Sequence, residues 1–163
     1  MEDQTANAAV ETPGDPEYTE GVFCWGQEDE AQPIALIDPR TEIQGRIAGV
    51  PCIKKSEDPA KTSVWLEVLH EPIDYPTAGL ITDRLFFPDA LTEPRKRNTQ
   101  LNRLNDFKAC FGWSPPVGEK PAPGQEYPEL QDAVGNFRVG VEKDRSGQFP
   151  DKNSVMKYLP AVA

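Results

Sequence analysis

Residues 43–53 read IQGRIAGVPCI, and this stretch says most about the fold. Apolar side chains stand at Ile43 and Ile47 and then at Val50. The alternation that is typical of a strand therefore changes parity beside Gly49. Such a change at a glycine is typical of a β-bulge or of a strongly coiled strand. We therefore predict a first strand that bends sharply, as a small closed barrel requires.

Four further stretches have the composition of short strands. Residues 63–69 (SVWLEVL) and 80–87 (LITDRLFF) are separated by a segment that two prolines interrupt. Residues 133–143 and 154–159 add two strands near the C-terminus, joined by a turn-rich loop. In the second and third strands one face is expected to point into the core, with Val64, Leu66, Val68, Ile81, Leu85 and Phe87.

A helix is predicted between the third and fourth strands. Its apolar residues recur at three- and four-residue spacing, at Leu101, Leu104, Phe107 and Phe111. Gly112 follows as the expected C-terminal cap. We expect the helix to begin after Asn98, because a cap at Thr92 would place the cations of residues 95–97 in the first turn, where the helix dipole disfavours them.

Three strands, a helix and two strands predict a mainly β fold. The order matches the five-stranded Greek-key barrel of the OB type, with one helix between strands 3 and 4. Another small antiparallel α+β sheet is the alternative. An OB barrel binds its ligand on strands 2 and 3, and the loops between strands 1 and 2 and between strands 4 and 5 frame the groove.

Charge divides the 163-residue chain into two regions. Its formal net charge is −10, but residues 1–39 hold ten acids and no Lys or Arg, whereas residues 40–163 hold 17 basic and 17 acidic residues. We therefore expect residues 1–39 to be a flexible, Pro-containing acidic arm and residues 40–163 to form the OB-like domain. The arm also carries aromatic residues among its acids, at Tyr18, Phe23 and Trp25.

Several classes of protein are disfavoured by what the sequence lacks. It has no apolar run of membrane-spanning length and no signal-peptide pattern, so a cytoplasmic protein is expected. The three cysteines, Cys24, Cys52 and Cys110, are far apart and fit reduced structural thiols. The only histidine, His70, is expected to be an ordinary surface or strand-end residue. Without a catalytic or metal-binding motif, we expect neither an enzyme nor a cofactor.

The outward face of the second and third strands is the candidate binding site. It carries Trp65, Arg84 and Phe86, and aromatic rings beside a cation are typical of surfaces that bind single-stranded nucleic acid. Further cations predicted to contact phosphate are Arg46, Lys54, Lys55 and Arg138. The alternative is that Trp65 and Phe86 are structural, and either cover one end of the barrel or pack against the arm.

The domain also resembles a family of phage-encoded OB-fold proteins that bind single-stranded DNA. The resemblance runs from about residue 42 to 160 and rests on the first strand (EIQGRIAGVPCIKK), the second (SVWLEVL), the end of the helix (FKACFGW) and the closing stretches AVGNFRVGVEKDRSGQ and NSVMKYLP. It implies binding through Trp65, Arg84 and Phe86, and adds Tyr158. The acidic arm and the neutral domain depart from the family pattern.

The resemblance implies cooperative coating of single strands, largely independent of base sequence, in phage replication or recombination. The implied partners are single-stranded DNA and further copies of the chain on that DNA, in the host cytoplasm. We expect the arm either to compete for the groove as a mimic of nucleic acid or to dock a replication or recombination protein. The alternative function is an acidic protein-interaction or inhibitor module that acts on a basic partner.

Overall fold

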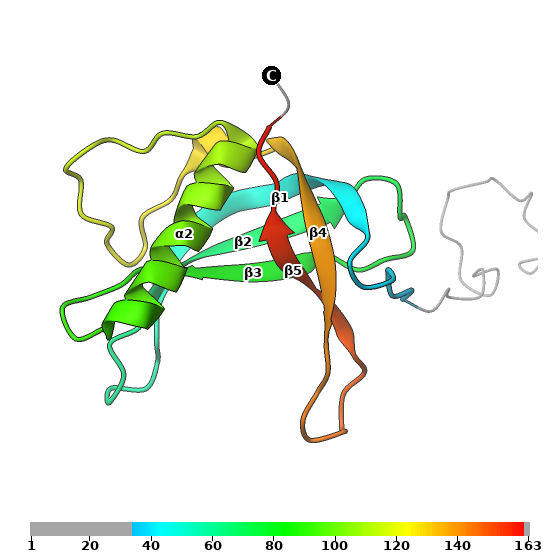
Figure 1. Cartoon of the computed structure of the whole chain (residues 1–163), viewed down its shortest axis with the longest axis horizontal. Helices are drawn as coiled ribbons and strands as arrows, with labels where there is room; N and C mark the ends of the chain where they lie inside the picture. Colours follow the sequence, from blue (N-terminus) through cyan, green and yellow to red (C-terminus); the bar gives the residue numbers. More distant parts are fainter. Residues whose placement is uncertain (1–33, 162–163) are drawn as a thin grey trace, which may run out of the picture. The chain divides into compact units, whose positions relative to one another are not determined.

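The computed structural model describes residues 34–161 as a mainly β domain with one α-helix (Figure 1). The roles predicted for residues 1–33, including Cys24 and the arm's aromatic residues, lie outside the described residues. In chain order the elements are β1 (Glu42–Lys55), β2 (Val64–Pro72), β3 (Ile81–Phe86), α2 (Pro94–Phe111), the 3₁₀ turn η1 (Pro128–Leu130), β4 (Val134–Glu142) and β5 (Lys152–Tyr158).

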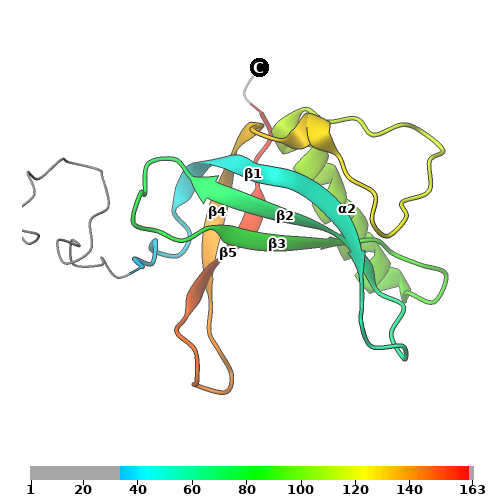
Figure 2. The same ribbon diagram turned by 180° about the vertical axis from the view of Figure 1, so that it is seen from behind.

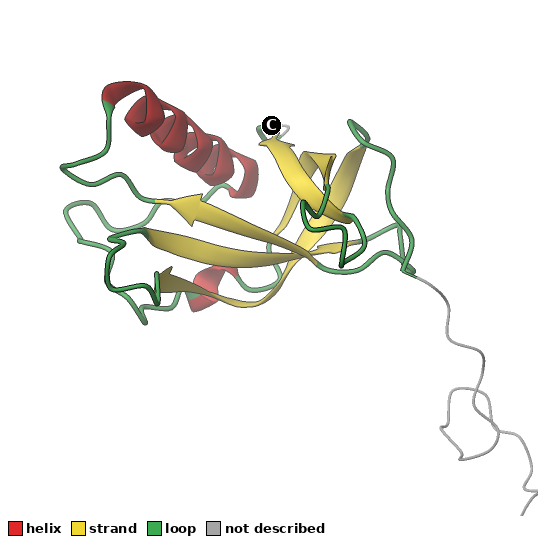
Figure 3. Cartoon of the chain, turned by 90° about the horizontal axis from the view of Figure 1, so that it is seen from below, coloured by secondary structure: helices red, strands yellow, loops and turns green. Residues whose placement is uncertain are grey.

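The five strands form one antiparallel sheet in the order β3-β2-β1-β4-β5. Its two edge strands, β3 and β5, nevertheless lie close to each other because the sheet curls. Figure 3 shows α2 on one side of the sheet, where it packs against β3, β4 and β5. The structure therefore confirms the prediction of a mainly β fold with five strands and a helix after the third. It shows these strands as one antiparallel sheet.

β1 is the long, bent strand that the glycine pattern predicts (Figure 2). Its register against β2 shifts between Ala48 and Cys52, and Gly49 has a φ of 72°, which is unfavourable for other residues. The first part of β1 pairs with β4, and the connection that leads into β4 hydrogen-bonds to the rest, for example from Ile53 N to the carbonyl of Gln125 (2.8 Å). The bend thus lets one strand belong to two parts of the curled sheet.

The helix begins earlier than the sequence analysis predicts. Its N-cap is Glu93, whose carboxylate accepts a hydrogen bond of 2.7 Å from the backbone N–H of Lys96, and Pro94 occupies the first position. Asn98 is therefore the wrong N-cap, because this carboxylate and the proline stabilise the start despite the cations in the first turn. The predicted end is confirmed: Gly112 has a φ of 58° and its N–H bonds the carbonyl of Lys108.

The core lies between the curled sheet and α2. Ile81 and Leu85 are buried while Arg84 and Phe86 are exposed, which confirms the predicted faces of β3. Ile37, which the sequence analysis assigns to the arm, is also buried in this core, so residues 34–39 pack with the domain. Within residues 34–161, no helix is long and apolar enough to cross a membrane.

A buried polar network joins the two edge strands. Tyr158 of β5 donates a hydrogen bond of 2.6 Å to the carboxylate of Asp83 on β3. Arg103 of α2 donates to both Asp83 oxygens at 2.9 Å and to the carbonyl of Val155 on β5, also at 2.9 Å. Side chains therefore connect β3 to β5, which the described residues do not join by a β-ladder.

Candidate nucleic-acid interface

The outward side chains of β1, β2 and β3 line up in rows across the sheet. Lys54 is the cross-strand neighbour of Trp65, and Trp65 is the neighbour of Phe86. The next row runs from Cys52 through Glu67 to Arg84. The register thus brings together four of the residues that the sequence predicts for binding, Lys54, Trp65, Arg84 and Phe86, and we call this surface the β2–β3 face.

Trp65 is not the open stacking surface that the sequence analysis expects. Its side chain is only 8 % exposed, because the guanidinium carbon of Arg84 lies 4.9 Å from the centre of the indole and the ring of Phe86 lies 5.5 Å away. Phe86 itself is 36 % exposed. The accessible surfaces are therefore the Phe86 ring and the Arg84 guanidinium, and Trp65 supports both of them from below.

Glu67 sits between the two cations of the face. Its carboxylate lies 3.0 Å from Lys54 Nζ and 3.6 Å from Arg84 Nε. Partial burial opposes ionisation, but the hydrogen bond and charge of Lys54, together with Arg84, keep the pKa of Glu67 below its ordinary value. Hydrogen bonding to Glu67 and its negative charge in turn raise the pKa of Lys54. This group of three therefore carries a net charge of +1 at neutral pH.

The other predicted cations lie farther from this group. Arg46 is on the same outward side of β1 but beyond the bend, where it pairs with Glu71 at 3.5 Å. Arg138 of β4 pairs at 3.0 Å with Glu42, at the opposite end of β1 from Lys54. Lys55 is exposed at the end of β1, beside the loop to β2. The structure thus brings Lys54 and Arg84 together with the aromatic residues but leaves Arg138 apart.

Tyr158 is wrongly predicted as a binding residue. Its side chain is 1 % exposed, and its hydroxyl is engaged with Asp83 and with His70 Nε2, 2.8 Å away. The alternation of β5 turns this ring inward, against Phe107 and Phe137. A nucleic acid on the surface does not reach it.

His70 is buried rather than at the surface. None of its side chain is exposed, and it packs against Phe111 and Phe137. Burial lowers the pKa of His70 to about 4, so the ring is neutral at neutral pH. Because the Tyr158 hydroxyl donates to Asp83, it accepts from Nε2–H of His70, which fixes the tautomer. This chemistry is enclosed in the core and serves the fold.

Sequence reasoning missed two features of the interface. Alternation puts Glu67 on the same side of β2 as Trp65, but it does not reveal the ion pairs of Glu67 with Lys54 and Arg84, which depend on the register of three strands. A cavity beside Phe86 also went unseen, because loop residues far apart in the sequence form it. Only the fold brings the β1–β2 loop, the end of β3 and α2 to one place.

Comparison with known proteins assigns no family to the domain. Neither the models of protein families nor the curated proteins compared with it match this chain.

Proposed function

We propose that residues 40–161 form a Greek-key barrel of the OB type. The strand order and the position of the helix after β3 agree with that fold. The nearness of β3 and β5 and the Asp83–Tyr158–Arg103 network support closure of the sheet into a barrel. In Figure 1 the β1–β2 loop and the β4–β5 loop project to the same side, toward opposite ends of β3, as expected for loops that frame a groove.

The proposed function of this barrel is to bind single-stranded DNA on the β2–β3 face. The observation that carries the proposal is the row of Lys54, Trp65 and Phe86, with Arg84 over the indole. Bases stack on the exposed ring of Phe86 and on the planar guanidinium of Arg84, a mode that tolerates every base because each has a π-face. Trp65 keeps both groups in position.

The cations supply the contacts to phosphate. Lys54 and Arg84 are held by ion pairs with Glu67, and their side chains remain about half exposed, at 52 % and 56 %. An ammonium has three N–H donors and a guanidinium five, so each cation can bind a phosphate while it keeps its contact with Glu67. Counterion release then makes the affinity fall as salt rises.

We further propose that the protein belongs with the phage single-stranded-DNA-binding proteins that it resembles and acts in replication or recombination as a binding protein, not as an enzyme. Coating of a strand requires only the stacking face and phosphate contacts, and no base-specific code. The net charge of −10 is consistent with this proposal because the excess of acid lies in residues 1–39, whereas residues 40–163 hold equal numbers of basic and acidic residues.

A titration with fluorescent oligonucleotides tests this function. A labelled single strand and the matching duplex are titrated with the full chain at 50 mM and 200 mM salt. We expect the single strand to bind more tightly than the duplex and its affinity to fall at the higher salt. Absence of binding at 50 mM salt would contradict the proposal and favour the alternative of an acidic module for a basic protein partner.

A further inference from the structure

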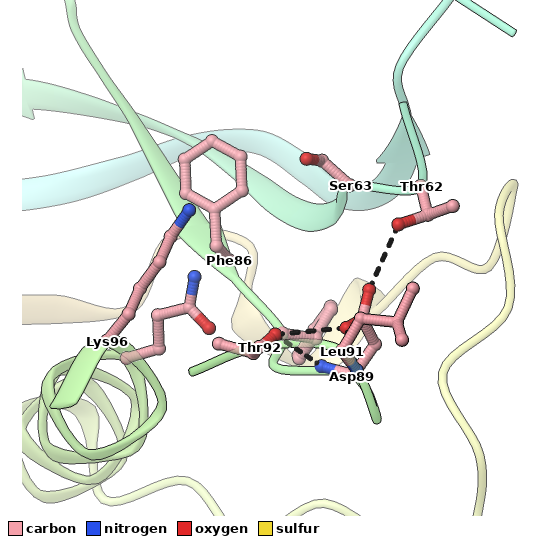
Figure 4. A pocket seen from close by; sticks show the side chains of 9 residues that line it. Thr62, Ser63, Phe86, Asp89, Leu91, Thr92 and Lys96 are labelled. Atoms are coloured by element: carbon pink, nitrogen blue, oxygen red, sulfur yellow. Dashed lines mark hydrogen bonds between the residues drawn. The ribbon is translucent and has the colours of Figure 1, made fainter. Parts of the chain in front are cut away.

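A cavity of about 390 Å³ opens beside Phe86, at one end of the β2–β3 face (Figure 4). Its volume is within the range of about 300–1,000 Å³ that is typical of small-molecule sites. Three separate parts of the chain form it: the end of the β1–β2 loop, the end of β3 with the loop that follows, and the first turns of α2. The lining includes Thr62, Ser63, Phe86, Asp89, Lys96 and Gln100.

Hydrogen bonds hold the polar wall of this cavity in place. Asp89 accepts from the Thr62 hydroxyl at 3.0 Å and from the backbone N–H of Leu91 at 2.8 Å. The hydroxyl of Thr92 also lies 3.1 Å from Asp89 Oδ1 and accepts from the N–H of Asp89 at 3.0 Å. The bond from Thr62 ties the β1–β2 loop to the segment before α2, and the others fix that segment internally. The cavity is therefore a built feature rather than a gap between independent loops.

Gln100 contributes an amide with unused hydrogen-bonding capacity. Its Oε1 atom is buried and accepts no hydrogen bond from any of residues 34–161. A buried acceptor without a donor is unfavourable by about 1–3 kcal/mol. The terminal torsion of a glutamine is broad, so a small rotation turns this oxygen toward a donor that enters the cavity. The amide is thus better satisfied with a hydrogen-bonding ligand than without one.

The lining suits a nucleobase better than an isolated phosphate, because an aromatic ring and two hydrogen-bond acceptors accompany its one cation, Lys96. One wall is the aromatic ring of Phe86, and Figure 4 shows Lys96 reaching from α2 toward that ring. The carboxylate of Asp89 repels an anion, whereas it and Gln100 Oε1 can both accept from an exocyclic amino group. An aromatic ring that carries such a group matches the stacking wall and the acceptors at once.

We propose that this cavity takes one base of the bound strand, stacked on Phe86, and that it prefers a base with an exocyclic amino group, such as cytosine, to thymine. This inference rests on the proposed binding of single-stranded DNA and adds a base preference to it. Stacking alone would leave the face indifferent to sequence; the cavity makes one position along the strand selective.

The test compares two homopolymers of equal length and charge, oligo-dC and oligo-dT, in anisotropy titrations at one salt concentration. Wild-type protein should bind oligo-dC about fivefold more tightly or better, the lower limit for one side chain–base contact. Gln100→Leu should abolish this preference, and Asn102→Leu, at an exposed position on the same helix, should retain it. Ser63→Phe, which fills the cavity, is a second variant should Gln100→Leu fail to fold.

Two results would overturn the base pocket, and only one of them would also overturn the proposed function. Tight and equal binding of both homopolymers by wild-type protein, or a preference that survives both Gln100→Leu and Ser63→Phe, would refute the base pocket and leave the proposed function standing. Failure of wild-type protein to bind either homopolymer at low salt would refute the proposed function together with the pocket.

Discussion

Charged side chains on the two faces of β3 differ in how far they are buried and in what they contact. Facing inward, Asp83 is engaged by Tyr158 and Arg103, and its side chain is only 12 % exposed. Facing outward, Arg84 shares Glu67 with Lys54 at the surface and remains 56 % exposed. The inner group has all its partners within the domain, so changing it should affect folding. The two outer cations keep about half of their side-chain surface open to a ligand, so changing them should affect binding.

The largest expected effect is on the inner side. Arg103→Met leaves the Asp83 carboxylate without its cation. Breaking a buried ion pair costs about 3–5 kcal/mol, and because Arg103 is 30 % exposed the loss here should lie at the lower end of that range. Chemical denaturation should show a loss of that size. The double variant Asp83→Leu/Arg103→Met should recover part of it, because the unpaired charge is removed. Unaltered stability of Arg103→Met would mean that the network does not hold β3 to β5.

Low pH should lower the stability of the domain, because the buried His70 also lies on the inner side of the sheet. The pKa of this buried ring is about 4, against an ordinary value of 6.5, so between those pH values the unfolded chain binds a proton that the folded chain excludes. Stability should therefore fall as the pH falls from 6.5 to 4, by about 3 kcal/mol in all. His70→Gln should lose this part of the pH dependence.

His70 is the only histidine of the chain, so its ring can be followed without ambiguity by NMR. An NMR titration that places its pKa near 6.5 would contradict the buried neutral ring.

On the outer side the main expected effect is a smaller one, on binding. Phe86→Ala removes the exposed stacking ring and should weaken binding of single-stranded DNA by about 1–3 kcal/mol. The ring is about two-thirds buried and packs on Trp65, so thermal unfolding should also shift to a lower temperature, and binding is compared where both proteins are fully folded. Met156→Ala, at an exposed apolar position on β5, is the matched control and should bind as the wild type does. Equal affinities for both variants would exclude Phe86 as a stacking surface.

The smallest expected effect concerns the cations. Arg84→Gln should reduce the slope of log K against log salt by about 0.7, the value for one phosphate contact on a single strand. Arg138→Gln removes a cation from the far end of β1, which lies apart from the β2–β3 face, and should leave the slope unchanged. A larger effect of Arg138→Gln would shift the site toward β4.

Strand faces and bends could be predicted because they depend on neighbouring residues in the sequence. Contacts between side chains from distant parts of the chain could not. Alternation placed Arg84 and Phe86 outward, and Gly49 marked the bend of β1, because both depend on neighbouring residues. The covered state of Trp65 depends on how the Arg84 side chain lies across a neighbouring strand. Likewise, Tyr158 and Asp83 are 75 positions apart, and no periodic pattern links them.

The most direct test of the difference between the two sides of the sheet is to map the bound strand by NMR. Amide signals of isotopically labelled protein are recorded while an unlabelled single-stranded oligonucleotide is added. We predict that the signals of Trp65, Glu67, Arg84 and Phe86 shift while those of Arg138 and Lys157, which neighbour each other on β4 and β5, stay in place. Shifts confined to β4 and β5, or none at saturating oligonucleotide, would contradict binding on the β2–β3 face.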